Sequence, residues 1–161
     1  MQAGLVQAAS ITRPSVPVRI QVGRWQELGK LATEVRSEVF VREQRIPLEI
    51  ELDGQDDTCI HVVAVAQDSG VPVGTARLFP DGHVGRMAVL WDWRGRGIGR
   101  LIMERLIAFG RANGYEQLVL QSQVHASDFY RKLGFSALAD PPEIVLVAGI
   151  PHVEMRCRLT K

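Results

Sequence analysis

The sequence carries almost no net charge, because 19 lysines and arginines are set against 18 aspartates and glutamates in 161 residues. Without an excess of either sign, the chain has no overall field that would attract nucleic acid or an anionic membrane. Aromatic residues do not interleave with basic ones along one face either, so the sequence predicts no nucleic-acid partner.

Cysteines are scarce as well. The chain has two, Cys59 and Cys157, which lie far apart and show no metal-ligand spacing. Each lies in an apolar stretch, so we expect two buried, reduced thiols rather than a disulfide. The carboxylates of residues 49–57 do not have the spacing of an EF-hand calcium loop, and we predict no metal.

Long hydrophobic runs are absent. No apolar segment approaches the roughly 18 residues of a membrane span, and residues 1–17 have no continuous apolar stretch of the secretory type. These absences predict no membrane association and a cytoplasmic location. We expect residues 1–17 to be a flexible leader and residues 18–161 to form one domain of ordinary length.

What is present is an alternation of strand and helix patterns. Helices are predicted over residues 24–43, with Gly29 as a candidate break, over residues 98–112, and over residues 126–133. Residues 44–58 form a long acidic loop. Together the elements predict one α/β domain of the α+β type with a mixed sheet. The predicted strands are 18–22, 60–66, 72–79, 84–90, 118–121, 135–138 and 153–159.

Alternate glycines occupy the turn before helix 98–112, in the segment Arg94-Gly95-Arg96-Gly97-Ile98-Gly99-Arg100. Glycine allows a positive φ and a close approach to a ligand, and the amides of a helix N-terminus favour an anion. The three arginines add mobile positive charge, so the segment predicts a pyrophosphate cradle. The spacing fits neither a Walker A loop nor a dinucleotide fingerprint, and taken alone it is equally compatible with a glycine-rich surface turn.

Two motifs resemble the GNAT superfamily of N-acyltransferases. Arg-x-x-Gly-x-Gly at residues 94–99, after the strand residues 86–90, resembles that family's acetyl-CoA pyrophosphate loop and central strand. The resemblance covers residues 18–159 and implies a mixed, mostly antiparallel sheet of about six to seven strands flanked by about four helices. A second family motif is matched downstream by Phe129, Tyr130, Lys132, Gly134 and Phe135.

A narrower resemblance is to the ElaA/YjcF-like branch of the superfamily. It rests on residues 38–44, Ile46-Pro47, the acidic stretch to Asp57, His61 and residues 149–155. The substrates of this branch are poorly defined, so this resemblance sharpens the expected fold more than the function.

The resemblance implies an acetyl-CoA-dependent N-acetyltransferase in which the amine attacks the thioester directly. The backbone of Met87, Ala88 and Val89 is expected to line the pantetheine and polarise the acetyl carbonyl. Tyr130 matches the family's acid, which protonates the leaving thiolate; the alternative is a core tyrosine beside Phe129. The other expected cofactor-binding residues are Arg94, Gly95, Arg96, Gly97, Ile98, Gly99, Arg100, Gln121 and Ser127.

Glu43 is the first candidate for the general base, because it follows a helix that borders the acceptor site in the resembled fold. Ordered water is an alternative to any single base. The alternative side chains are His61, His125, His152 and Glu154.

The acceptor is expected to be a small-molecule amine or a protein amino group, and homodimers are common in the family. A CoA-binding module without catalysis is the alternative, which a Tyr130 facing away from the thiol would indicate. The loop carboxylates either attract a cationic acceptor or, as we favour, form an ordinary solvated loop. These are Glu49, Glu51, Asp53, Asp56 and Asp57.

Overall fold

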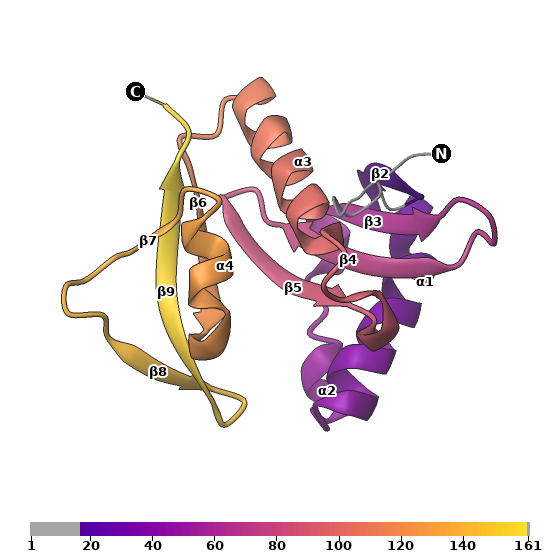
Figure 1. Cartoon of the computed structure of the whole chain (residues 1–161), viewed down its shortest axis with the longest axis horizontal. Helices are drawn as coiled ribbons and strands as arrows, with labels where there is room; N and C mark the ends of the chain where they lie inside the picture. The colour runs from indigo at the N-terminus through magenta and orange to yellow at the C-terminus, as the bar shows by residue number, and fades with distance from the viewer. Residues whose placement is uncertain (1–16, 161) are drawn as a thin grey trace, which may run out of the picture.

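Eight strands form one mixed sheet in the computed structural model, which describes residues 17–160. Their order is β2-β3-β4-β5-β6-β9-β7, with β8 paired to β9 (Figure 1). β5 and β6 are parallel, and all other paired strands are antiparallel. The strands are β2 Val18–Arg24, β3 Ile60–Ala66, β4 Pro72–Leu78, β5 His83–Val89, β6 Gln117–Gln123, β7 Ser136–Ala137, β8 Ile144–Val147 and β9 Ile150–Arg158.

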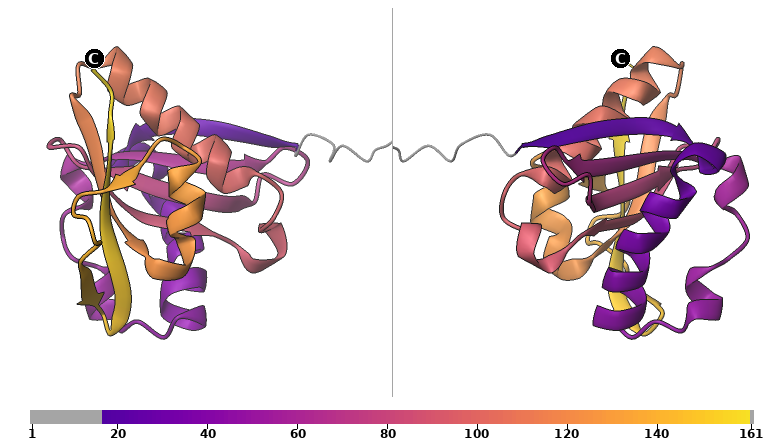
Figure 2. Two further views of the ribbon diagram at one scale, coloured as in Figure 1. Left: turned by 60° about the vertical axis from the view of Figure 1, so that its left-hand side comes forward. Right: turned by 90° about the vertical axis from the view of Figure 1, so that its right-hand side faces the viewer.

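Helices cover both faces of the sheet (Figure 2). Alternate residues of β3 explain this: Val63 and Val65 pack with α1, whereas Val62 and Ala64 belong to the core that contains α3. Leu106, fully buried, is part of the apolar face of α3 that the three-and-four spacing predicted. The helices are α1 Trp25–Arg36, α2 Leu48–Glu51, α3 Ile98–Ala112 and α4 Ser127–Arg131.

The structure confirms the predicted fold class and corrects three of its details. Gly29 does not break the first helix: it lies inside α1, where the Trp25 ring packs so closely that a Cβ would lie 2.9 Å from it. The helix instead continues from α1 into a π-helical segment, Ser37–Glu43. The eighth strand, β8, was not predicted, because it is a short hairpin strand with little burial and therefore shows no alternation of buried and exposed residues.

The third correction concerns the predicted loop of residues 44–58. It contains the short helix α2 and a 3₁₀ turn, Asp56–Thr58. The leader predicted for residues 1–17 lies outside the described residues, apart from Pro17. None of the helices in residues 17–160 is both long and apolar enough to cross a membrane.

The sheet opens between β5 and β6. These two strands pair only at His83 with Val119 and at Val84 with Leu120, after which they diverge (Figure 1). Beyond that point β5 pairs only with β4 on its other side. The edge of β5 that would have faced β6 is therefore left without a strand partner.

Candidate active site

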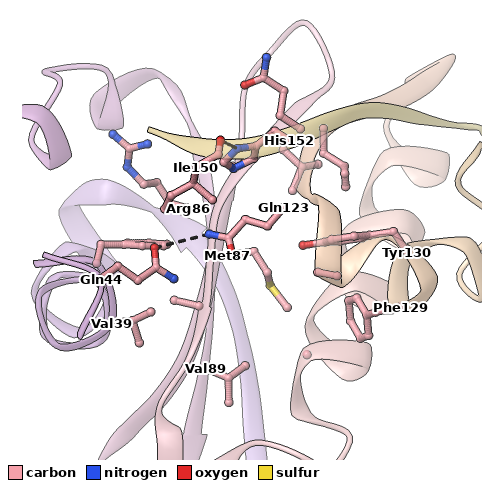
Figure 3. Close-up of a pocket in the computed structure, with 18 of the residues that line it drawn as sticks. Val39, Gln44, Arg86, Met87, Val89, Gln123, Phe129, Tyr130, Ile150 and His152 are labelled. Atoms are coloured by element: carbon pink, nitrogen blue, oxygen red, sulfur yellow. Dashed lines mark hydrogen bonds between the residues drawn. The ribbon is translucent and has the colours of Figure 1, made fainter. Parts of the chain in front are cut away.

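A cavity of about 1340 Å³ fills the opening between β5 and β6. It is larger than the pockets of roughly 300–1,000 Å³ that hold drug-sized ligands, so it has room for an extended ligand and a second molecule. The π-helical segment Ser37–Glu43 and α4 face each other across it (Figure 3). Most of the predicted site residues line it: Glu43, Met87, Ala88, Val89, Arg94, Gly95, Gly97, Ile98, Gly99, Arg100, Gln121 and Tyr130.

The glycine loop at one end of the cavity has the backbone that the sequence predicted. Gly95 and Gly97 have φ values of 75° and 84°, which other residues rarely adopt. A Cβ on Gly99 would lie 3.0 Å from Met87 Cε, so a larger residue there would make the Met87 side chain shift. The first amide to bond within the helix is that of Leu101, on the Gly97 oxygen at 3.1 Å. The preceding amides are those a helix leaves for an anion.

The three loop arginines differ from one another. Arg94 is not mobile: it binds both carboxylate oxygens of Glu43 at 2.7 and 2.8 Å, and its Nε donates to the Val89 carbonyl at 2.8 Å. Arg100 lines the cavity and pairs with Glu104 at 3.0 Å. Arg96 lies outside the cavity lining, with its guanidinium 4.9 Å from the Trp93 ring centroid. The expectation of three mobile charges is therefore wrong for Arg94.

A β-bulge shapes the central strand beside the cavity. Thr75 pairs with Ala88 and Arg77 with Gly85, so Ala76 alone faces both Arg86 and Met87. Arg86 takes the left-handed conformation, with a φ of 52°. Its side chain turns away from Met87, which projects into the centre of the cavity (Figure 3).

Tyr130 stands across the cavity from Met87, with its hydroxyl directed into the open space (Figure 3). Its ring is 8% exposed and makes edge contacts with Phe129 and Phe135, at 4.9 and 5.9 Å between centroids. Burial raises the pKa of Tyr130 to about 12, so the phenol keeps its proton at neutral pH. Ser127, in the same helix, lies outside the cavity lining and donates to the Val124 carbonyl at 2.9 Å.

The five candidate bases occupy very different places. Glu43 lines the cavity, but Arg94 occupies both of its oxygens. His61 is fully buried against the Trp25 ring and does not line the cavity, and Glu154 is exposed and does not line it either. His125 lines the cavity, with its Nε2 bonded to Gln123 Oε1 at 2.7 Å.

His152 lies in the cavity wall and, like His125, has one ring nitrogen bonded and the other without a hydrogen bond to any described residue. Its Nδ1 lies 2.7 Å from the Ile150 carbonyl oxygen, and since a carbonyl only accepts, Nδ1 carries the proton. In the neutral ring, Nε2 is then an acceptor. The side chain is 9% exposed, lines the cavity, and sits opposite Gln123 in the β6–β9 register.

Comparison with known proteins accounts for this arrangement. The model of the acetyltransferase (GNAT) domain matches residues 34–159. The chain belongs to the GNAT acetyltransferase family. Among its relatives is the Bacillus subtilis uncharacterized N-acetyltransferase YjcF, 36% identical over 137 residues, which cover 83% of this chain and 95% of YjcF.

Solved structures give the same result. Escherichia coli ElaA superposes with a TM-score of 0.76 at 25% identity, covering 87% of this chain and 99% of ElaA. An acyl-CoA N-acyltransferase from Pseudomonas aeruginosa superposes with a TM-score of 0.75 at 27% identity, covering 87% of this chain and 99% of that one. The similarity to YjcF and ElaA confirms the ElaA/YjcF-like branch within the GNAT family.

In this GNAT domain the acidic loop is not an ordinary solvated loop, contrary to our expectation. Arg36, which is 1% exposed, binds Glu51 Oε2 at 3.0 Å and Asp56 Oδ1 at 2.8 Å. Arg77, which is 4% exposed, binds Asp53 Oδ1 at 3.0 Å and Asp56 Oδ1 at 2.9 Å. These contacts fasten the loop to α1 and β4.

The network extends to the bulge of the central strand. Arg86 Nε donates to Glu51 Oε2 at 2.7 Å, and its Nη2 donates to the Glu51 carbonyl at 3.0 Å. The loop therefore holds the one left-handed residue of β5 in place. The sequence offered one signal for it: arginines at positions where the helix and strand patterns demand apolar residues, such as Arg36 and Arg77.

Proton affinities in this arginine–carboxylate network follow from the pairing. The hydrogen bond from Arg77 holds the pKa of Asp53 well below its ordinary value. Burial alone would raise the pKa of Asp56, but Arg36 and Arg77 outweigh it and the pKa is lowered. Burial lowers the pKa of the neighbouring His61. All three groups therefore stay in their basic forms at neutral pH.

The thiols behave as predicted. Cys59 and Cys157 are buried free thiols that are not joined in a disulfide, and burial raises the pKa of each. Within residues 17–160, no three histidine, cysteine or acidic side chains are grouped so as to hold a metal ion.

Proposed function

We propose that this GNAT protein transfers an acetyl group from acetyl-CoA to a primary amine by direct attack in a ternary complex. One observation carries the proposal: the glycine loop and the Tyr130 hydroxyl border one cavity, with the unpaired edge of β5 between them. An anion site, a free backbone edge and a proton donor in that order suit a phosphorylated thioester. The inward direction of Tyr130 favours an enzyme over a CoA-binding module without catalysis.

The loop would hold the pyrophosphate through the amides that follow Gly95, with Arg100 adding charge at the cavity rim. Along β5, the Val89 carbonyl is already used by Arg94. Ala88 pairs with Thr75 of β4, which uses its main-chain groups. The main-chain groups of Met87 and the amide of Val89 are therefore those that would bind the pantetheine and polarise the acetyl carbonyl. Gln121 lines the same side of the cavity from β6.

For proton transfer, we propose His152 in place of Glu43 as the base. The amine nitrogen bonds to the acetyl carbon and passes its proton to His152 Nε2, while the carbon–sulfur bond breaks. Tyr130 donates its proton to the departing thiolate, and His152 returns a proton to Tyr130 through solvent. Glu43 instead positions Arg94, which is tied to the end of the central strand.

The two tyrosines of the chain provide a matched test of the acid. Tyr130→Phe should lower kcat about a hundredfold, within the range typical of general acid–base catalysis, and change the KM for acetyl-CoA much less. Tyr115→Phe should leave both unchanged, because Tyr115 packs on Phe109 outside the cavity lining. Steady-state CoA release measures both variants, and equal turnover by Tyr130→Phe and the wild type would remove the acid role.

A further inference from the structure

We infer that the acceptor is an amine on an uncharged, apolar body, recognised without a carboxylate partner. This inference rests on the proposed function and names the substrate class of the same cavity. The acceptor would bind on the side of Met87 away from Val89, where Figure 3 shows Gln123, Ile150 and His152, with Gln44 beside Met87. The glycine loop follows Val89 in the chain, so the phosphates belong to the opposite side.

Apolar side chains dominate the acceptor side. They come from elements far apart in the sequence, and two of them, Ile50 of α2 and Val147 of β8, remain 53% and 38% exposed at the mouth. Exposed apolar groups beside a pocket are best explained by a ligand that covers them. The apolar lining consists of Phe40, Ile46, Ile50, Phe79, Val147 and Ile150.

No free carboxylate faces this space. Of the residues described, the acidic ones that line the cavity are Glu43 and Glu51, and arginines hold both. Glu51 is 2% exposed and receives two arginines, so it has neither the access nor the unpaired charge to bind an ammonium group. A cation brought here would lose its water without gaining a counter-ion, which is costly.

The charged groups of the cavity offer a cation no net attraction. Its two acidic residues are each paired with an arginine, Glu51 with Arg86 and Glu43 with Arg94. The polar groups left near Met87 are uncharged: the amides of Gln44 and Gln123, 3.5 Å apart, and the His152 ring. These accept or donate hydrogen bonds with a neutral amine, the form that attacks a thioester.

The inference separates two substrate classes that share the same reaction. Polyamines and lysine-rich peptides carry additional ammonium groups, for which this cavity offers no partner among the described residues. Alkylamines and arylalkylamines present one amine on an apolar body, which the lining fits. The buried arginine–carboxylate network creates this preference, since it occupies the carboxylates that would otherwise attract cations.

The test compares amines of equal length. Hexylamine and 1,6-diaminohexane differ only by a second ammonium group, and each is added to the protein saturated with CoA. We expect hexylamine to raise the Tm more, and its kcat/KM in CoA release from acetyl-CoA to be at least about tenfold higher, equivalent to roughly 1.4 kcal/mol. A larger Tm shift from the diamine, or no shift from either amine, would overturn the inference.

A designed carboxylate provides the reverse experiment. Gln44→Glu places an unpaired acid beside Met87 and should shift the kcat/KM ratio toward the diamine by about tenfold. Val71→Glu puts the same charge on the exposed turn before β4, outside the cavity lining, and should leave the ratio unchanged. If neither amine causes CoA release while hexylamine still gives the larger Tm shift, the proposed acetyl transfer fails, whereas the preference of the cavity for an amine on an apolar body stands.

Discussion

The arginines of the buried network and Arg100 of the glycine loop differ in their burial and in their ion-pair partners. Arg36 and Arg77 are 1% and 4% exposed and each binds two carboxylates, whereas Arg100 lies at the exposed N-terminus of α3 with one exposed partner, Glu104. The first group is satisfied within the fold. Arg100 has only an exposed partner and stands beside amides that the helix leaves unpaired, so these amides and Arg100 can bind an anion from outside the fold.

The comparison teaches that residue type and local charge do not distinguish a structural ion network from a ligand site. The acidic loop and the glycine loop are both rich in charge, yet only the latter is built of positive-φ glycines at a helix N-terminus. What decides the role is whether each charge already has a buried partner. The following predictions test that difference in order of expected effect.

The largest effect is expected for Arg36→Met, which leaves Glu51 and Asp56 buried without their shared cation. Removing one partner of a buried ion pair costs about 3–5 kcal/mol. The matched control is Arg42→Met in the following segment, whose pair with Glu38 is 77% and 51% exposed and worth at most about 0.5 kcal/mol. Urea unfolding measures both free energies, and equal losses would contradict the distinction.

Acid should weaken the buried network next. The folded-state pKa values of Asp53, Asp56 and His61 are all lowered, so the unfolded chain binds more protons as the pH falls. The contribution of these groups to the free energy of unfolding is complete at a pH above their ordinary pKa values, which are about 6.5 for histidine and about 4 for aspartate. It is lost as the pH falls below those values.

The free energy of unfolding should therefore fall when urea titrations are repeated from about pH 7 to about pH 2, with the part due to the aspartates falling below about pH 4. Asp53→Asn should flatten this dependence, because its carboxylate is paired with Arg77. Asp57→Asn should not, since Asp57 is exposed to solvent. A stability that stays constant over this range would contradict the account of the network.

The smallest effect is expected at the loop. Arg100→Gln should weaken acetyl-CoA binding about fivefold, because one exposed charge near a helix N-terminus contributes about 1 kcal/mol, and the loss should shrink at high salt. Arg96→Gln should change the Kd less than twofold, since Arg96 lies outside the cavity lining. Titration calorimetry decides the order, and a larger effect at Arg96 would reverse the assignment.

Much of this arrangement was predictable from local patterns. The helix over residues 98–112 and the positive φ values of Gly95 and Gly97 follow from spacing and backbone freedom, and the structure confirms them. The family and its branch are likewise confirmed. The inward direction of Tyr130 agrees with its predicted role as acid, which stays a proposal.

What could not be predicted depends on pairs distant in sequence. Arg94 meets Glu43 across 51 positions, and Arg86 meets Glu51 across 35. The bulge at Arg86 cannot be recognised in the sequence, because β5 mixes buried, half-buried and exposed residues without a regular alternation. The choice of His152 over Glu43 rests on a hydrogen bond to Ile150 and on the pairing of Glu43, neither of which has a sequence signal.

The most direct test of the central claim is the Tm shift that acetyl-CoA causes in the wild type, in Gly97→Glu and in Gly114→Glu. Gly97 and Gly114 have φ values of 84° and 79°, and a Cβ on either meets nothing within 4 Å, so the two substitutions impose similar strain at opposite ends of α3. The account predicts that millimolar acetyl-CoA raises the Tm of the wild type and of Gly114→Glu by mass action, but not that of Gly97→Glu. No shift in the wild type, or an equal shift in Gly97→Glu, would contradict it.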